Sequence, residues 1–217
     1  MKKIIAINCS PRSTWNTATL VCEAAKGVEN QGATVKIIDL YKLDKFTGCV
    51  SCFGCKLPDN FGKCICKDGL YAVLEEIRNA DGLIIGTPNY LGDVTAGFRA
   101  LYERLIFQSL TYKTEIRSYN QRQIPVLMIM TSNASEDFYA QIGYDEMLKR
   151  YQGSLNAFVG PTKILISSDT LQVKDYSRYI WTMFNPEAKK QRHEAVFPED
   201  KKKAFALGEQ MVNGIWE

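Results

Sequence analysis

The sequence predicts an α/β fold in which a five-stranded parallel sheet carries helices on both faces. Short apolar runs of strand length alternate along the chain with segments whose apolar residues recur at helical spacing. This alternation is typical of parallel sheets, because the crossover helices pack on the sheet and bury it. The chain has 217 residues, of which 46% are hydrophobic, and we expect one domain over residues 1–217.

The first elements follow from local composition. Residues 3–8 form an isoleucine-rich run that ends at Cys-Ser-Pro, which predicts a buried strand and a turn. After Thr17 the apolar residues fall on one helical face until Gly32 ends the helix. Residues 35–40 predict a second strand, and a Cys-rich loop follows at about residues 44–67.

The same alternation continues to the end of the chain. The expected elements are a helix capped by Asp68, a strand at 83–87, a helix at 94–105, a strand at 126–131, a helix at 137–151, a strand at 162–167 and a final helix from Pro198. In that final helix Met211, Val212 and Ile215 are available for packing. Residues 169–197 predict an irregular, aromatic extension that covers the site or a neighbouring subunit. This succession favours the strand order 2-1-3-4-5, whose ligand crevice lies at the carboxyl ends of the strands.

Charge and composition exclude several classes of protein. The net charge is +3 and the basic residues are scattered, apart from a run at 201–203 that predicts a solvated helix face, so we expect no nucleic-acid partner. No apolar run approaches the roughly 20 residues that cross a bilayer, and no signal peptide is recognisable, which predicts no membrane insertion and a cytoplasmic location. The only histidine, His193, lies in a basic stretch, which argues against a hydrolase triad.

The loop after the first strand has the chemistry of an anion site. Amides at a helix start favour a phosphate, and Ser10, Asn16 and Thr17 add short polar side chains. Arg12 adds a permanent positive charge. Spacing alone leaves open an ordinary strand–helix connection with a polar cap.

The loop after the third strand suits a flat ligand. Pro88 ends the strand, Gly92 allows the backbone to approach a ligand closely, and Tyr90 offers an aromatic face. Without further information the same residues predict a simple turn with Tyr90 at its rim.

Together the two loops resemble the NADPH-dependent FMN reductases and the related iron–sulfur flavoproteins of the flavodoxin-like superfamily. The matching motifs are S-P-R-x-x-x-N-T in the first loop, and P-x-Y-x-G-x-V-T with a helix ending E-R-L in the second. Cys9 and Trp15 depart from the family, which usually has glycine and a small residue there. The resemblance implies that the first loop wraps the FMN phosphate, that the second contacts the flavin ring, and that a third contact follows the fourth strand. The implied FMN-binding residues are Ser10, Arg12, Asn16, Thr17, Pro88, Asn89, Tyr90, Leu91, Gly92, Asp93, Thr131 and Ser132.

The cysteines gather in one segment. The chain has seven, all before residue 67, and an odd number without an export signal argues against a disulfide scaffold. Thiolates spaced as in Cys49, Cys52, Cys55 and Cys64 can converge on zinc or on an iron–sulfur cube. The iron–sulfur flavoproteins have a compact motif of this kind, whereas many flavin reductases have similar cysteines without an established cluster. Three alternatives stay open: a [4Fe-4S] cluster on these four residues, free or redox-active thiols, and zinc.

The resemblance implies an FMN-dependent oxidoreductase with the chemistry on the flavin and no catalytic side chain. NAD(P)H is the expected donor, and a flavin, a quinone, a similar small molecule or a redox protein is the expected acceptor. One alternative is an iron–sulfur flavoprotein that transfers electrons through FMN and a [4Fe-4S] cluster. Another is a non-enzymatic module in which zinc holds the cysteine loop as a partner surface. Because similar reductases are commonly dimers or tetramers, we also expect a homo-oligomer, with the aromatic stretch at 176–184 as a candidate interface.

Overall fold

The centre of the molecule is a parallel sheet. The computed structural model describes residues 1–214 and residue 216. Its strands are β1 (Lys3–Asn8), β2 (Thr34–Asp39), β3 (Gly82–Pro88), β4 (Val126–Thr131) and β5 (Thr162–Ser167). All neighbours pair in parallel in the order β2-β1-β3-β4-β5, which confirms the predicted fold and strand order.

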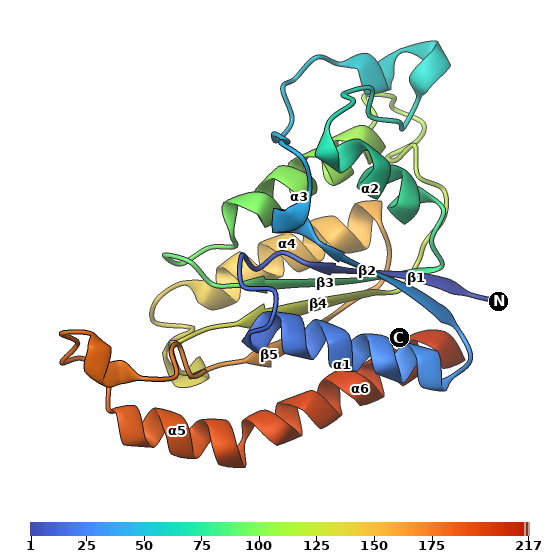
Figure 1. Cartoon of the computed structure of the whole chain (residues 1–217). Helices are drawn as coiled ribbons and strands as arrows, with labels where there is room; N and C mark the ends of the chain where they lie inside the picture. The colour runs from blue at the N-terminus through green and yellow to red at the C-terminus, as the bar shows by residue number, and fades with distance from the viewer. Residues whose placement is uncertain (215, 217) are drawn as a thin grey trace.

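Helices cover both faces of this sheet. They are α1 (Asn16–Asn30), α2 (Gly69–Arg78), α3 (Ala96–Ser109), α4 (Tyr144–Phe158), α5 (Pro186–Ala195) and α6 (Phe197–Asn213). Figure 1 shows α2, α3 and α4 on one face and α1 and α6 on the other, with α5 continuing beyond the sheet. In the described part of the chain no helix is long and apolar enough to span a membrane.

The strands divide the core into two layers, because successive side chains point to opposite faces of the sheet. In β1, Ile5 and Ile7 belong to the core under α2, α3 and α4. Ile4 and Ala6 belong to the core against α1 and α6. A strand buried on both faces therefore has a continuous apolar run rather than an alternating one.

Helices α1 and α6 pack backbone against backbone. A Cβ atom at Gly27 would lie 2.0 Å from the carbonyl oxygen of Phe205, and one at Gly208 would lie 2.0 Å from that of Ala24. Both positions therefore require glycine. Met211 of α6 is buried against this layer, as predicted, whereas the expected contact of Ile215 lies outside the described residues.

The helix predicted at 137–151 is misplaced. The structure has a short 3-10 turn at Glu136–Phe138, and α4 begins only at Tyr144. Gly143, at the N-cap of α4, has a φ of 74°, in the left-handed region, which separates the two elements. The apolar spacing is continuous across this break, so it did not reveal the boundary.

The segment predicted as irregular at 169–197 contains α5. Proline occupies its first turn at Pro186, and the side chain of Asn185 accepts hydrogen bonds from the amides of Glu187 and Ala188. Asn-Pro-Glu is a helix-start signal. Apolar spacing does not predict this helix, because α5 has almost no apolar face and its buried residue is Lys189.

Candidate functional site

A cavity of about 350 Å³ opens where β1, β3 and β4 end. Figure 1 shows these carboxyl ends on the left, beside the first turn of α1. The volume lies within the range of ligand pockets, about 300–1,000 Å³. Its walls come from the loops that follow four strands, and the lining residues are Ser10, Arg12, Trp15, Asn16, Thr17, Pro88, Asn89, Tyr90, Leu91, Thr131, Ser132, Asn133, Thr170, Gln172 and Trp181.

Most residues predicted to bind FMN therefore meet at one cavity. All of them line it except Gly92 and Asp93. Segments far apart in the chain reach this edge because the strands are parallel, which brings all their carboxyl ends to one side.

The first turn of α1 faces the cavity without a cap. Trp15 is the N-cap residue, makes no side-chain cap hydrogen bond, and no acidic residue follows in the first turn. The leading amides of a helix have no partner within it, and they carry the positive end of the helix dipole. The guanidinium of Arg12 is exposed beside them, and Ser10 lies at the start of the same loop. This end of the cavity therefore favours an anionic group.

Several of the expected polar side chains already have protein partners, and the guanidinium of Arg12 itself donates from Nη1 to the carbonyl oxygen of Gln172. Asn16 donates from Nδ2 to the carbonyl oxygen of Leu171 at 2.8 Å. The hydroxyl oxygens of Thr17 and Thr131 lie 2.7 Å apart in a buried hydrogen bond. These side chains shape the loop, as do the amides of Ser10 and Arg12, which donate to Oδ1 of Asn8 and Oγ of Ser10. The leading amides of α1 have no partner within the helix.

Three buried amide atoms at the cavity have no hydrogen-bond partner among the described residues. They are Nδ2 of Asn89, Oδ1 of Asn133 and Oε1 of Gln172. Leaving such a group unpaired costs about 1–3 kcal/mol. All three residues line the cavity, which makes them candidates to pair with a bound ligand.

The loop after β3 is a tight turn. Tyr90 and Asp93 exchange two backbone hydrogen bonds of 2.8 and 3.1 Å. Leu91 and Gly92 between them have φ values of 54° and 85°, the signature of a type I′ turn. Oδ1 of Asn89 accepts from the Gly92 amide at 3.1 Å, whereas Nδ2 of the same side chain has no partner among the described residues.

Asp93 stands behind the turn rather than at the cavity. Its Oδ1 accepts from the hydroxyl of Tyr151 on α4 at 2.8 Å. Burial raises the pKa of that tyrosine, and the bond to Asp93 raises it further while one from Arg99 lowers it. Asp93 thus anchors the turn to α4, and its contact with a flavin stays a prediction.

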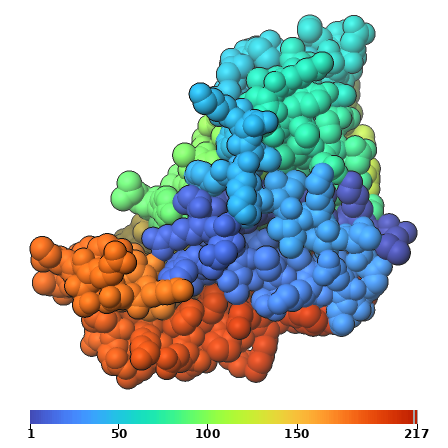
Figure 2. Space-filling view, in the orientation of Figure 1, coloured from blue at the N-terminus to red at the C-terminus, as the bar shows by residue number. Residues whose placement is uncertain are grey.

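The far wall comes from the segment after β5. Thr170, Gln172 and Trp181 line the cavity, and the ring of Trp181 stacks on Tyr179 with centroids 4.4 Å apart. Figure 2 shows this part of the chain, in orange, standing out beside the blue first loop. None of the three was predicted individually. The aromatic composition of the segment was the only signal for it.

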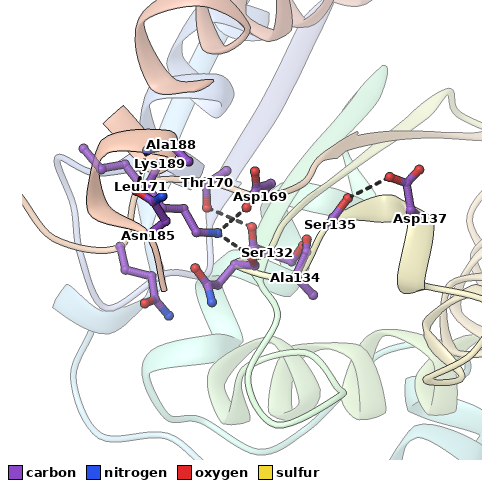
Figure 3. Close-up of polar contacts among 12 residues, drawn as sticks. Ser132, Ala134, Ser135, Asp137, Asp169, Thr170, Leu171, Asn185, Ala188 and Lys189 are labelled. Atoms are coloured by element: carbon purple, nitrogen blue, oxygen red, sulfur yellow. Dashed lines mark hydrogen bonds and ion pairs between the residues drawn. The ribbon is translucent and has the colours of Figure 1, made fainter. Parts of the chain in front are cut away.

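A buried lysine joins the loops after β4 and β5. Nζ of Lys189 donates to the carbonyl oxygen of Asn133 at 2.8 Å and to Oδ1 of Asp169 (Figure 3). Beside it, the amide and hydroxyl of Thr170 both donate to the carbonyl oxygen of Ser132, at 2.9 and 3.0 Å. The sequence carries no signal that distinguishes Lys189 from its exposed neighbours.

The cysteine segment forms a separate, much smaller cavity of about 20 Å³. Its lining includes the four predicted ligands and one further cysteine, namely Cys49, Cys52, Cys55, Cys64 and Cys66. All are free thiols, and within residues 1–214 and 216 no three Cys, His, Asp or Glu side chains are placed to hold a metal ion. Such a space holds about one water molecule. In this conformation the residues do not fit a four-iron cluster.

A buried guanidinium borders the cysteine cavity. Arg104 is 2% exposed, lies 2.5 Å from Oδ1 of Asp68 and donates to the carbonyl oxygen of Cys66 at 2.7 Å. Partial burial acts to raise the pKa of Asp68, but hydrogen bonds from Arg104 and from the Thr47 amide outweigh it and hold that pKa below its usual value. The pair ties the cysteine segment to α3.

Comparison with known proteins identifies curated relatives over part of the chain. An iron-sulfur flavoprotein of Methanocaldococcus jannaschii is 36% identical over 102 residues, 47% of this chain and 51% of the relative. One of Archaeoglobus fulgidus is 38% identical over 104 residues, 47% of this chain and 48% of the relative. The chain thus matches about half the length of these relatives.

Solved structures share the fold over nearly the whole chain. An NAD(P)H:quinone oxidoreductase from Methanothermobacter marburgensis is 12% identical with a TM-score of 0.71, covering 97% of this chain and 96% of that one. An azoreductase from Bacillus anthracis is 13% identical with a TM-score of 0.68, covering 97% and 100%. At this identity they establish the flavodoxin-like fold alone. The sequence itself identifies the family. The model of the NADPH-dependent FMN reductase family matches residues 2–155, and the chain belongs to that family.

Proposed function

We propose that this chain binds FMN in the 350 Å³ cavity and acts as an FMN-dependent oxidoreductase. NAD(P)H is the proposed electron donor, and a flavin, a quinone or a similar small molecule is the proposed acceptor. One observation carries the proposal. Three amide side chains, those of Asn89, Asn133 and Gln172, each have one polar atom without a hydrogen-bond partner among the described residues, and they line a cavity that ends at an uncapped helix N-terminus.

The helix end suits the phosphate. The amides that begin α1 at Asn16 and Thr17 are free donors, and Arg12 supplies the permanent charge. Arg12 is the only charged side chain among the described residues that line the cavity, so the charge of the site is concentrated at this end.

The remaining walls suit a flat heterocycle. Asn89, Asn133 and Gln172 offer a donor and two acceptors to the polar edge of the ring. Tyr90 and Trp181 offer aromatic surface to its faces. When bound, the flavin accepts a hydride or single electrons, so the protein has to bind and orient it rather than provide an acid or base.

Binding of FMN to flavin-free protein tests the proposal. We expect quenching of flavin fluorescence to saturate at one FMN per chain, and the loaded protein to oxidise NAD(P)H when a quinone is present. Asn89→Ala removes one unpartnered amide and should weaken binding, whereas Asn213→Ala, at the exposed end of α6, should not. Failure of the unaltered chain to bind FMN would refute the proposal.

The second candidate is an iron–sulfur flavoprotein that transfers electrons. The observation in its favour is that all five cysteines from Cys49 to Cys66 line one cavity, although that cavity must open to admit a cluster. About four irons per chain after anaerobic purification would support it. Iron-free protein that still oxidises NAD(P)H would reject it, and zinc without bound flavin would favour the non-enzymatic module instead.

We further propose that residues 1–217 act as one domain that forms a homo-oligomer in the cytoplasm. The side chains of Ile180 and Met183, in the aromatic stretch at 176–184, are 102% and 86% exposed. Exposed apolar groups of this size mark contact surfaces when they lie together. Light scattering on the purified protein measures the number of chains, and Ile180→Ser should shift an oligomer towards the monomer.

A further inference from the structure

Lys189 is unusual among the lysines of this chain because it is buried. Its residue is 7% exposed, and it is the one buried residue of α5, whose other described residues are exposed or half-buried. Lysine is almost never fully buried unless it is paired. Here the ammonium group donates to Asp169 and to the carbonyl oxygen of Asn133.

The two partners of Lys189 lie in two different loops, each of which has residues that line the cavity. Asn133 lies in the loop after β4, and its own side chain has the unpartnered Oδ1. Asp169 begins the loop after β5 and donates its amide to the carbonyl oxygen of Ala134 at 2.9 Å. Thr170, next to Asp169, lines the cavity and bonds Ser132 of the other loop. Figure 3 shows Lys189 reaching from α5 into the place where these loops meet.

The lysine lies outside the part of the chain that the family describes. The family match ends at residue 155, and both Lys189 and Asp169 follow it. The family match therefore includes Ser132 and Asn133 of the loop after β4, but neither of the two residues whose ion pair holds that loop to the segment after β5.

We propose that Lys189 is a positioning residue of the FMN site. It holds the loops at 132–134 and 169–172 together, so that the side chains of Asn133 and Gln172 face the ligand. The ion pair of Lys189 and Asp169 also places two opposite charges directly behind the cavity wall. This inference rests on the proposed function, because its main readouts are the affinity and the potential of bound FMN.

The two halves of the pair allow a mechanical role to be separated from an electrostatic one. Lys189→Met and Asp169→Asn break the same ion pair, but only Lys189→Met also removes the hydrogen bond to Asn133. A purely mechanical clamp therefore predicts changes in the same direction for both variants, smaller in Asp169→Asn. An electrostatic role predicts opposite effects, because the two substitutions leave charges of opposite sign. Loss of the lysine leaves an uncompensated carboxylate, which disfavours electron uptake by the flavin, whereas loss of the aspartate leaves an uncompensated ammonium, which favours it.

The experiment compares four variants of the full chain with the unaltered protein. Lys189→Met should raise the dissociation constant of FMN by about tenfold, the equivalent of about 1.4 kcal/mol, and Lys189→Arg should recover most of the loss. Lys190→Met is the matched control, because it removes the same charge from the next, exposed residue of α5 and should leave the affinity unchanged. The midpoint potential of bound FMN should fall in Lys189→Met and rise in Asp169→Asn.

Amide hydrogen exchange gives a readout that needs no flavin. The amide of Thr170, which donates to Ser132, should exchange faster in Lys189→Met than in Lys190→Met. The inference is overturned if the Lys189 and Lys190 variants bind FMN equally, or if both halves of the pair shift the potential in one direction. Those results leave the proposed function intact, whereas absence of FMN binding by the unaltered chain overturns both.

Discussion

Thr17 on α1 and Thr131 at the end of β4 are joined by a hydrogen bond of 2.7 Å that passes over β3. Gly86 of β3 makes this crossing feasible. A Cβ atom there would lie 2.4 Å from Cγ2 of Val21 and 3.0 Å from Cγ2 of Thr17. Because Gly86 has no side chain, the first turn of α1 can pack close to β3, at the edge of the sheet where the cavity opens.

Gly86→Ala should therefore destabilise the fold and displace the first turn of α1. Overpacking of this kind costs about 1–3 kcal/mol. Urea unfolding measures the free energy, and FMN titration should show weaker binding. The control is Gly153→Ala, since nothing lies within 4 Å of a Cβ at this position of α4. There alanine should stabilise by about 0.5–1 kcal/mol, and an equal loss at both sites would contradict the crowding at Gly86.

Arg12→Met should weaken FMN binding about 10- to 100-fold, because it removes the only charge that we place beside the phosphate. Fluorescence titration at low and at high salt measures the effect, and the salt dependence should decrease in the variant. Arg178→Met removes an exposed charge that does not line the cavity and serves as control. Riboflavin, which lacks the phosphate, should bind the Arg12 variant and the unaltered chain alike; a large difference would contradict this role.

Leu91→Asn should stabilise the turn after β3. Leu91 has a φ of 54° and its side chain is fully exposed, so leucine is strained there and contributes no packing. Asparagine tolerates the left-handed region, and we expect a gain of about 0.5–1 kcal/mol in the free energy of unfolding. Ile180→Asn, at a position equally exposed but without a positive φ, should give no such gain.

Low pH should decrease the free energy of unfolding, because it protonates Asp68. The pKa of this carboxyl is lower in the folded than in the unfolded chain, mainly because Arg104 and the Thr47 amide outweigh the opposing effect of burial. A depressed pKa contributes stability that is present above the unfolded value, about 4, and is lost as the pH falls through the folded value. Urea unfolding between pH 6 and about pH 2 should show this loss, and Asp68→Asn should show a smaller slope.

Arg104→Met should lower the free energy of unfolding by more than the removal of an exposed charge does. It leaves Asp68 partly buried without its cation, and breaking a buried pair costs about 3–5 kcal/mol. The side chain of Asp68 is 16% exposed, so we expect the lower end of this range. Arg99→Met on the same helix removes an exposed pair with Glu103 and should cost less than about 1 kcal/mol.

The sheet could be predicted because three of its strands, β1, β3 and β4, are buried on both faces. A continuous apolar run such as Ile4 to Ile7 is typical of a buried parallel strand. The helices that connect such strands favour the observed strand order. The break at Gly143 could not be predicted from apolar spacing, because Tyr139 and Met147 on either side of it are both buried. Propensity and periodicity describe local order and do not locate such a turn.

The cavity residues before position 133, apart from Trp15, were predicted because they lie in loops that follow strands directly. Gln172, Trp181 and Lys189 could not be found in this way. Trp15 meets Leu171, and Lys189 meets Asn133, only because the folded chain brings distant segments together. A buried lysine looks like its exposed neighbours until the residues around it are known.

A crystal structure of the chain with FMN tests the central claim most directly. We predict the phosphate within hydrogen-bond distance of the amides that begin α1, beside Arg12, and the ring against Tyr90 with its polar edge at Asn89, Asn133 and Gln172. FMN bound elsewhere on the molecule, or these three amides still unpaired beside it, would contradict the account.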